Sequence, residues 1–241
     1  MLIKTRAVVL HTLKYGESQI IADMLTESHG RLTFIQRISK TNRTKVKKQL
    51  LQPLTILNME FDFRPNARIL HIKDASLAWA FASIPFDEYK LSISLFLAEF
   101  ILYTTREEQQ NEALFQYIEN SVIWLDTCRR SCSNFHLVFM LRLSKFIGFL
   151  PNTDNKEEGN FFDLRNGCFT AEAPIHQDFL QPGEACKIKT LMRMNYDTMH
   201  LFAFSRNERN RCAELILKYY RLHIPGFPEP KSLAVLHDVF S

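Results

Sequence analysis

The spacing of apolar residues changes once along this chain, at about residue 78, and this change restricts the folds open to it. Before it, five short segments show the apolar alternation and β-branched content typical of strands. Each is bounded by turn-forming or polar residues, and five short strands suit a small closed barrel. The segments are RAVVLHTL, IIADMLT, RLTFIQRI, LTILNMEFDF and ARILHIKDASL.

Two connections between these segments predict tight turns. His29 and Gly30 separate the second segment from the third, and glycine tolerates the positive φ that such a turn needs. The sequence RPNA, at residues 64–67, separates the fourth segment from the fifth. Both connections therefore predict antiparallel neighbouring strands.

Beyond residue 78 the apolar residues recur at helical spacing. Asp87 is a candidate N-cap, and Gly148 followed by Pro151 is a candidate stop signal. Ser205 and Glu208 have the spacing of a capping box. We therefore predict helices within residues 87–105, 111–128, 134–151 and 205–224.

Together these patterns predict a mixed chain of two domains. Residues 1–78 are expected to form a five-stranded OB-fold β-barrel that binds nucleic acid, and residues 79–241 an α-helical domain. A polar insert is expected near residues 152–183 of the second domain, either as loop throughout or as loop with one hairpin. At 241 residues and 46% hydrophobic content, the chain can bury real cores.

Positive charge is concentrated between the third and fourth predicted strands. The basic segment, residues 37–49 (RISKTNRTKVKKQ), holds six lysines and arginines and no acid, and no acid occurs from Ser28 to Met59. Lysine and arginine neutralise phosphates without reading base sequence, so this segment predicts sequence-tolerant nucleic-acid binding. The alternative is a solvated connecting loop. The cations are Arg31, Arg37, Lys40, Arg43, Lys45, Lys47 and Lys48.

Two stretches carry a family resemblance. TRAVVLHTLKYGESQIIADMLTESHGRLTFI, followed by the basic segment and QLLQPLTILNMEF, resembles the amino-terminal region of the RecO family. FMLRLSKFIGFLPN resembles a helix of the same family that ends at a glycine and a proline. The resemblance covers most of the chain and agrees with the order of a barrel followed by helices.

This resemblance implies a role in bacterial recombinational DNA repair. RecO proteins bind single- and double-stranded DNA, anneal complementary strands, and act with RecR to load the recombinase RecA onto strands coated by single-strand-binding protein, without catalytic turnover. On this analogy the seven cations above are DNA-binding candidates. Phe34 is a candidate stacking residue, with a place in the core as the alternative. Arg142 and Lys145 are candidate contacts for the acidic tail of single-strand-binding protein, with ordinary surface charge as the alternative.

The chain departs from the family at a metal site. Many members carry four zinc-binding cysteines in paired CxxC motifs after the proline that Pro151 matches, whereas this segment keeps only Cys168, with Cys186 farther on. Closed zinc sites need four ligands, so we predict no zinc and no other cofactor. Cys128 and Cys132, four residues apart, would share a helix face and could act with His136 as metal ligands, but packing of buried thiols is the favoured interpretation.

The remaining features argue against other classes. The stretch from Leu91 to Tyr103 is shorter than the ~20 residues that span a bilayer. The first apolar run is too short for a signal peptide, so we expect no export signal. Five scattered cysteines suit a reducing compartment, so we expect a cytoplasmic, nucleoid-associated protein with no membrane partner. Two alternatives stay open: an adaptor whose basic segment meets an acidic protein or membrane surface, and a metal-dependent nuclease using paired acids such as Asp62 and Asp74.

Overall fold

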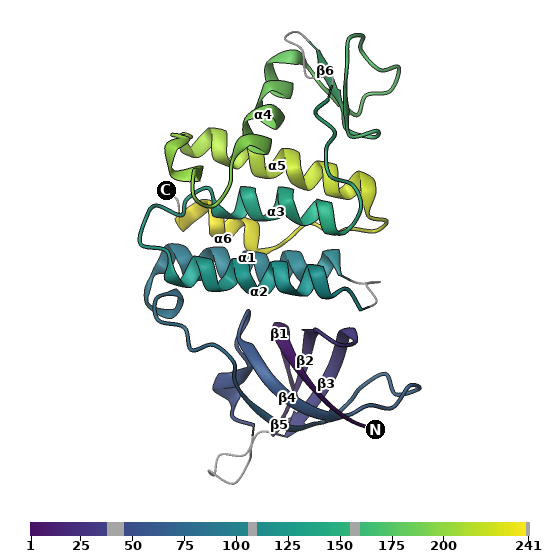
Figure 1. Cartoon of the computed structure of the whole chain (residues 1–241), viewed down its shortest axis with the longest axis vertical. Coiled ribbons are helices and arrows are strands. Elements are labelled where there is room, and N and C mark those ends of the chain that lie inside the picture. The colour runs from purple at the N-terminus through teal and green to yellow at the C-terminus, as the bar shows by residue number, and fades with distance from the viewer. Residues whose placement is uncertain (38–45, 106–109, 155–159, 240–241) are drawn as a thin grey trace. The chain divides into compact units, whose positions relative to one another are not determined.

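Five strands at the start of the chain pair into one antiparallel sheet (Figure 1). This computed structural model describes residues 1–37, 46–105, 110–154 and 160–239. The chain divides into two compact units: the first contains Met1–Thr127 and Pro230–Val239, and the second contains Cys128–Glu229. The boundary at residue 78 remains a prediction. The strands are β1 (Leu2–Tyr15), β2 (Gln19–Thr26), β3 (Gly30–Arg37), β4 (Ile56–Asp62) and β5 (Ile72–Leu77).

The strand order of this sheet is β3-β2-β1-β4-β5. Gly30 turns the chain between β2 and β3 at a φ of 66°, and the amide of Ala67 donates to Arg64 O at 3.0 Å, so both predicted turns are confirmed. A single parallel bridge, between Phe34 and Leu70, links β3 to the residues before β5. Among the described residues no continuous ladder closes the sheet, so the closed OB-fold barrel is not confirmed.

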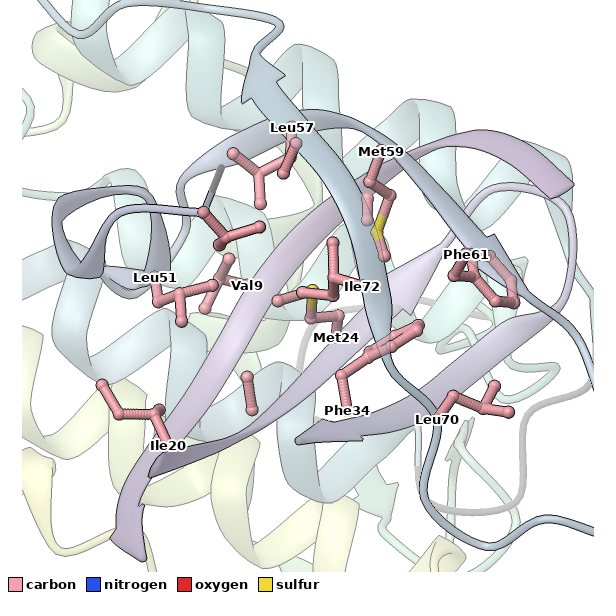
Figure 2. Close-up of a cluster of buried hydrophobic side chains, with 14 of the residues drawn as sticks. Val9, Ile20, Met24, Phe34, Leu51, Leu57, Met59, Phe61, Leu70 and Ile72 are labelled. Carbon is pink, nitrogen blue, oxygen red and sulfur yellow. The ribbon is translucent and has the colours of Figure 1, made fainter. Parts of the chain in front are cut away.

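Alternate side chains of the sheet meet in one apolar core. Figure 2 shows Met24, Phe34, Met59 and Phe61 from three strands pointing toward one another. Phe34 is 0% exposed, and the centroid of its ring lies 5.2 Å from that of Phe61, with the two rings packed edge to face. A ring enclosed in this way has no face to offer a base. The core interpretation of Phe34 is therefore confirmed, and the stacking role is wrong.

Two predicted helices follow in the first unit, together with one that was not predicted. They are α1 (Glu88–Thr104), α2 (Glu112–Thr127) and α6 (Ser232–Val239), preceded by the short 3₁₀ helix η2 (Ile84–Phe86). The carboxylate of Asp87 accepts from the amides of Tyr89 and Lys90, so the predicted N-cap is confirmed. Glu99 of α1 accepts from the amides of Lys231 and Ser232, at 3.0 and 2.8 Å, and so holds the residue before α6 and the first residue of α6.

The second unit combines helices with a small sheet. Its helices are α3 (Phe135–Phe146), α4 (Pro182–Arg193) and α5 (Arg206–His223), with the 3₁₀ helix η3 (Met199–Leu201). Ser205 and Glu208 form the predicted capping box at the start of α5. Three short strands, β6 (Phe161–Asp163), β7 (Cys168–Thr170) and β8 (Phe179–Leu180), lie in the polar insert, in the order β7-β6-β8. The antiparallel pair of β6 and β7 is the hairpin that the prediction allowed for, whereas β8 was not predicted.

Hydrogen bonds to one carboxylate organise this insert. Asp163 is only 3% exposed and accepts from the amides of Arg165 and Asn166, at 2.8 and 3.1 Å. The Asn166 side-chain amide donates to the other oxygen, Oδ2, at 2.7 Å, and His176 Nε2 lies 3.4 Å from Oδ1. Burial raises the pKa of Asp163, but these hydrogen bonds outweigh it and leave the pKa below its usual value. Asp163 is therefore ionised at neutral pH and fixes the turn between β6 and β7.

Candidate nucleic-acid interface

Four of the seven predicted DNA-binding cations lie among the described residues. Arg31 and Arg37 are the second and last residues of β3, and Lys47 and Lys48 lie at the start of the 3₁₀ helix η1 (Lys48–Leu51). The other three predicted DNA-binding residues, Lys40, Arg43 and Lys45, lie outside the described residues.

Arg31 and Arg37 differ in their surroundings. The guanidinium of Arg31 is partly buried and donates from Nη1 to Leu102 O, 2.9 Å away near the end of α1. Arg31 thus contributes a contact between sheet and helix. Arg37, six residues along the same strand, is exposed. Of the two cations of β3, Arg37 is the one whose position suits a phosphate.

The lysines before β4 are held at the surface by their neighbours. Val46, the residue before Lys47, is 0% exposed within the core of the sheet, and Leu51 at the end of η1 is 2% exposed. These two apolar side chains fix the backbone of η1 from both sides. Lys47 and Lys48 are themselves exposed, so their ammonium groups face solvent from an anchored segment.

These exposed cations are not neutralised within the described part of the chain. Arg37, Lys47 and Lys48 form no ion pair with any described residue. Elsewhere on the same sheet, Lys4 pairs with Glu60 at 2.7 Å and Lys73 pairs with Asp62 at 2.9 Å. A cation without a protein carboxylate can approach a phosphate without first leaving a partner.

A cavity of about 440 Å³ lies elsewhere on this sheet, over β1, β4 and β5. Lys4 and Arg6 line it, but each is already paired, Lys4 with Glu60 and Arg6 with Glu27. The lining also includes Asp74. Its acids outnumber its cations, so the cavity does not suit a phosphate.

The two predicted tail contacts lie on α3 and are both exposed. Arg142 Nη2 donates to Met194 O, 2.8 Å away at the C-cap of α4, which leaves part of its guanidinium available. Lys145 lies three residues farther along the same helix.

The cysteine hypothesis rested on a helix that the structure does not have. Cys128 and Cys132 lie in the connection between α2 and α3 rather than on one helix face. Cys132 and His136 are buried, which favours the packing interpretation. Within the described residues, no group of three His, Cys, Asp or Glu side chains could hold a metal ion. No helix in the described ranges is long and apolar enough to cross a bilayer.

Sequence reasoning passed over two exposed arginines. Arg64 and Arg68 both lie on the connection between β4 and β5. The sequence RPNA, at residues 64–67, predicts only a turn; Arg64 begins that turn, and Arg68 directly follows it. They add positive charge to the sheet, at a connection separate from that of the basic segment.

Comparison with known proteins gives a consistent result along the whole chain. Residues 1–81 match the family described as Recombination protein O N terminal, and residues 85–233 match Recombination protein O C terminal. A protein of Phocaeicola vulgatus named DNA repair protein RecO is 49% identical over 241 residues, which is 100% of both chains. Proteins of the same name from Bacteroides fragilis and Flavobacterium psychrophilum are 48% and 33% identical, again over 100% of both chains. The chain therefore belongs to the RecO family of DNA repair proteins.

Proposed function

We propose that this protein is a non-catalytic recombination mediator that binds single- and double-stranded DNA. It anneals complementary strands and, together with RecR, helps to load recombinase onto single strands coated by single-strand-binding protein. Family membership supports this role, since the matching families are those of recombination protein O and the similar proteins are named for DNA repair.

The observation that carries the DNA-binding proposal is the set of exposed cations around the basic segment. Arg37 is the first residue of that segment, Lys47 and Lys48 lie near its end, and none of the three pairs with a described carboxylate. Phosphate binding there releases counterions. With two strands bound, the same cations lower the repulsion between their phosphates, which is the barrier that opposes pairing.

We further infer that the five-stranded sheet is a partly open barrel of the OB type. Its order β3-β2-β1-β4-β5 brings β3 and β5 to opposite edges, and the Phe34–Leu70 bridge joins those edges in parallel. Two backbone hydrogen bonds support that bridge: Ile35 N to Leu70 O at 2.8 Å, and Leu70 N to Thr33 O at 2.9 Å. Closing the order in this way gives the five-stranded Greek-key barrel of oligonucleotide-binding domains.

For the partner proteins, we propose that Arg142 and Lys145 bind the acidic tail of single-strand-binding protein. Their exposure on one helix supports this, because a carboxylate tail needs an accessible cation. The contact with RecR rests on family membership, and no surface is assigned to it.

Salt dependence tests DNA binding. On single strands, the slope of log K against log salt should become shallower by about 0.7 for each phosphate that the protein no longer neutralises. Lys47→Ala with Lys48→Ala removes two cations and should therefore flatten the slope by about 1.4. The matched control is Lys4→Ala with Lys73→Ala, which removes two paired lysines and should leave the slope unchanged. An unchanged slope in the first variant would place DNA binding elsewhere.

Annealing tests the mediator role. Complementary strands coated with single-strand-binding protein should anneal faster when this protein is added, and the coated strands should lose that stimulation in Arg142→Ala with Lys145→Ala. Naked strands should anneal equally with both forms. If the variant lost both activities together, the two cations would act in DNA binding rather than in tail recognition.

A further inference from the structure

The outer face of β1, β2 and β3 carries side chains in four cross-strand rows. Strand register sets each row, because paired residues project to the same side of a sheet. From one end to the other, the rows are Val8–Leu25–Arg31, His11–Asp23–Thr33, Leu13–Ile21–Ile35 and Tyr15–Gln19–Arg37. The buried residues Ile20, Ala22 and Met24 lie on the opposite face of β2.

The two ends of this face differ. At the first row, Val8 is 0% and Leu25 is 3% exposed, and Arg31 donates to the carbonyl of Leu102 in α1. At the other end, Leu13 is 55% and Tyr15 is 54% exposed. The sheet is therefore covered at its Arg31 end and open over its last two rows.

The open half combines an aromatic ring, aliphatic side chains and a cation. Tyr15 and Leu13 stand on the same face of β1, two residues and so ~7 Å apart. Arg37 is in the same row as Tyr15, two strand spacings or ~10 Å away. The only acid in the four rows, Asp23, is occupied: Thr33 Oγ1 donates to it at 2.6 Å, and His11 Nδ1 lies 3.6 Å from its other oxygen.

We propose that this open half, centred on Tyr15, is a platform on which unpaired bases stack while Arg37, at the end of the same row, holds an adjoining phosphate. This rests on the proposed DNA binding and adds to it a preference for single strands. Charge complementarity identifies the occupant, because the apolar rows end at Arg37, where the basic segment begins.

The selectivity follows from the geometry of nucleic acids. An aromatic ring can stack on a base only when the base is free of its own neighbours, which is the case in single strands and not in a duplex. A cation binds the phosphates of either form. The platform should therefore strengthen single-strand binding without changing duplex binding, whereas Lys47 and Lys48 should act on both.

The experiment compares affinity for an oligothymidine and for a duplex of equal length, each over a series of salt concentrations. Tyr15→Ala should weaken single-strand binding about tenfold, within the range of base–aromatic stacking, with the salt slope unchanged. Duplex affinity should stay within twofold. Tyr15→Phe keeps the ring and should bind like the wild type. Tyr15→Leu keeps the apolar bulk on the strand and should lose nearly as much as Tyr15→Ala.

A matched control is Phe86→Ala, which removes a side chain that is 86% exposed but lies on η2, outside the platform. It should leave both affinities unchanged. Equal binding by Tyr15→Ala and wild type would overturn the platform, as would an equal loss on duplex, or a Tyr15→Leu protein that binds normally. The proposed function is judged separately by the salt slope of the lysine variants, so one proposal can fail while the other stands.

Discussion

The indole Nε1 of Trp79, just after the last strand of the sheet, donates to the carboxylate of Asp126 at the end of α2, at 3.1 Å. Three backbone amides converge on the same carboxylate, those of Ala82, Ser83 and Ile84, at 2.8 to 3.1 Å. Asp126 is only 3% exposed. One carboxylate therefore fixes the segment that leads from β5 to α1.

Replacing this carboxylate should destabilise the first unit. In Asp126→Asn, the new amide directs its hydrogens at amides that also donate, so the free energy of unfolding should fall by roughly 2–3 kcal/mol. Denaturant titration measures it, with Asp197→Asn, at an exposed site, as the control. Equal stability in the two variants would mean that the segment is held by packing alone.

The stabilisation that Asp126 provides should be lost in acid. Burial raises the pKa of Asp126, but the hydrogen bonds from the three amides and from Trp79 outweigh it, so the pKa lies below the usual 3.8. A carboxyl whose pKa is lower in the folded state than in the unfolded state stabilises the fold at pH values above its unfolded-state pKa. This contribution is lost as the pH falls toward and through its folded-state pKa. The stability difference between wild type and Asp126→Asn should therefore be full above pH ~5 and shrink below pH ~4. A constant difference down to pH 3 would contradict this.

Replacing Arg6 should make stability depend on pH in the direction opposite to that expected for Asp126. Its guanidinium joins Glu27 to Glu119 of α2 and lies 5.5 Å from the centre of the Phe115 ring. Burial is the main reason that the pKa of Glu119 is raised above 4.5, and Arg6 partly offsets it. Arg6→Met should cost about 3 kcal/mol at pH 7, because it leaves a buried carboxylate unpaired.

Protonation of Glu119 relieves that cost. A raised folded pKa means that the folded state binds the proton more tightly, so the variant should regain stability as pH falls from 7 toward 5. Adding Glu119→Gln to Arg6→Met should recover much of the loss at pH 7 and remove most of the pH dependence. Unfolding by guanidinium chloride at pH 7 and at pH 5 measures the free energy of unfolding of each variant. No recovery in the double variant would show that the pair contributes little.

Gly167 should not tolerate a side chain. Its φ is +64°, and an added Cβ would overlap Oη of Tyr219, which donates to Phe149 O at 2.7 Å. Gly226, at a φ of +67°, has open space around it. Gly226→Ala should therefore cost only the strain of a left-handed backbone, about 1 kcal/mol, and Gly167→Ala about 1–3 kcal/mol more. Thermal unfolding of both variants makes the comparison, and equal costs would contradict the overlap.

Two arginines of one strand should separate stability from DNA binding. Arg31→Ala removes the hydrogen bond to Leu102 O and should lower the free energy of unfolding by about 1–2 kcal/mol. Arg37→Ala should change stability by less than about 0.5 kcal/mol and should reduce the salt slope of DNA binding. If Arg31→Ala kept full stability and reduced the slope, Arg31 would belong to the DNA interface.

Local sequence was enough for elements whose stabilising groups are close neighbours in the chain. Asp87 caps α1, and Ser205 and Glu208 cap α5, because each bond spans two or three residues. The helix α6 was missed because it is short and because the amides at its start, those of Lys231 and Ser232, donate to Glu99, 132 and 133 residues away. The helix α4 was missed because Gln181 gives it no side-chain cap and it begins within a polar stretch.

The sequence by itself determined the antiparallel strands, the helices α1, α2, α3 and α5, and where positive charge would gather, since periodicity, capping and charge are properties of neighbouring residues. Only the tertiary structure decided which residues those elements expose. Strand register turned Phe34 into the core and Tyr15 outward. Because α1 packs near the sheet, Arg31 donates a hydrogen bond to the carbonyl of Leu102. Arg37, farther along the same strand, forms no ion pair with the described residues. These outcomes depend on contacts between distant segments, whose energies no single stretch of sequence contains.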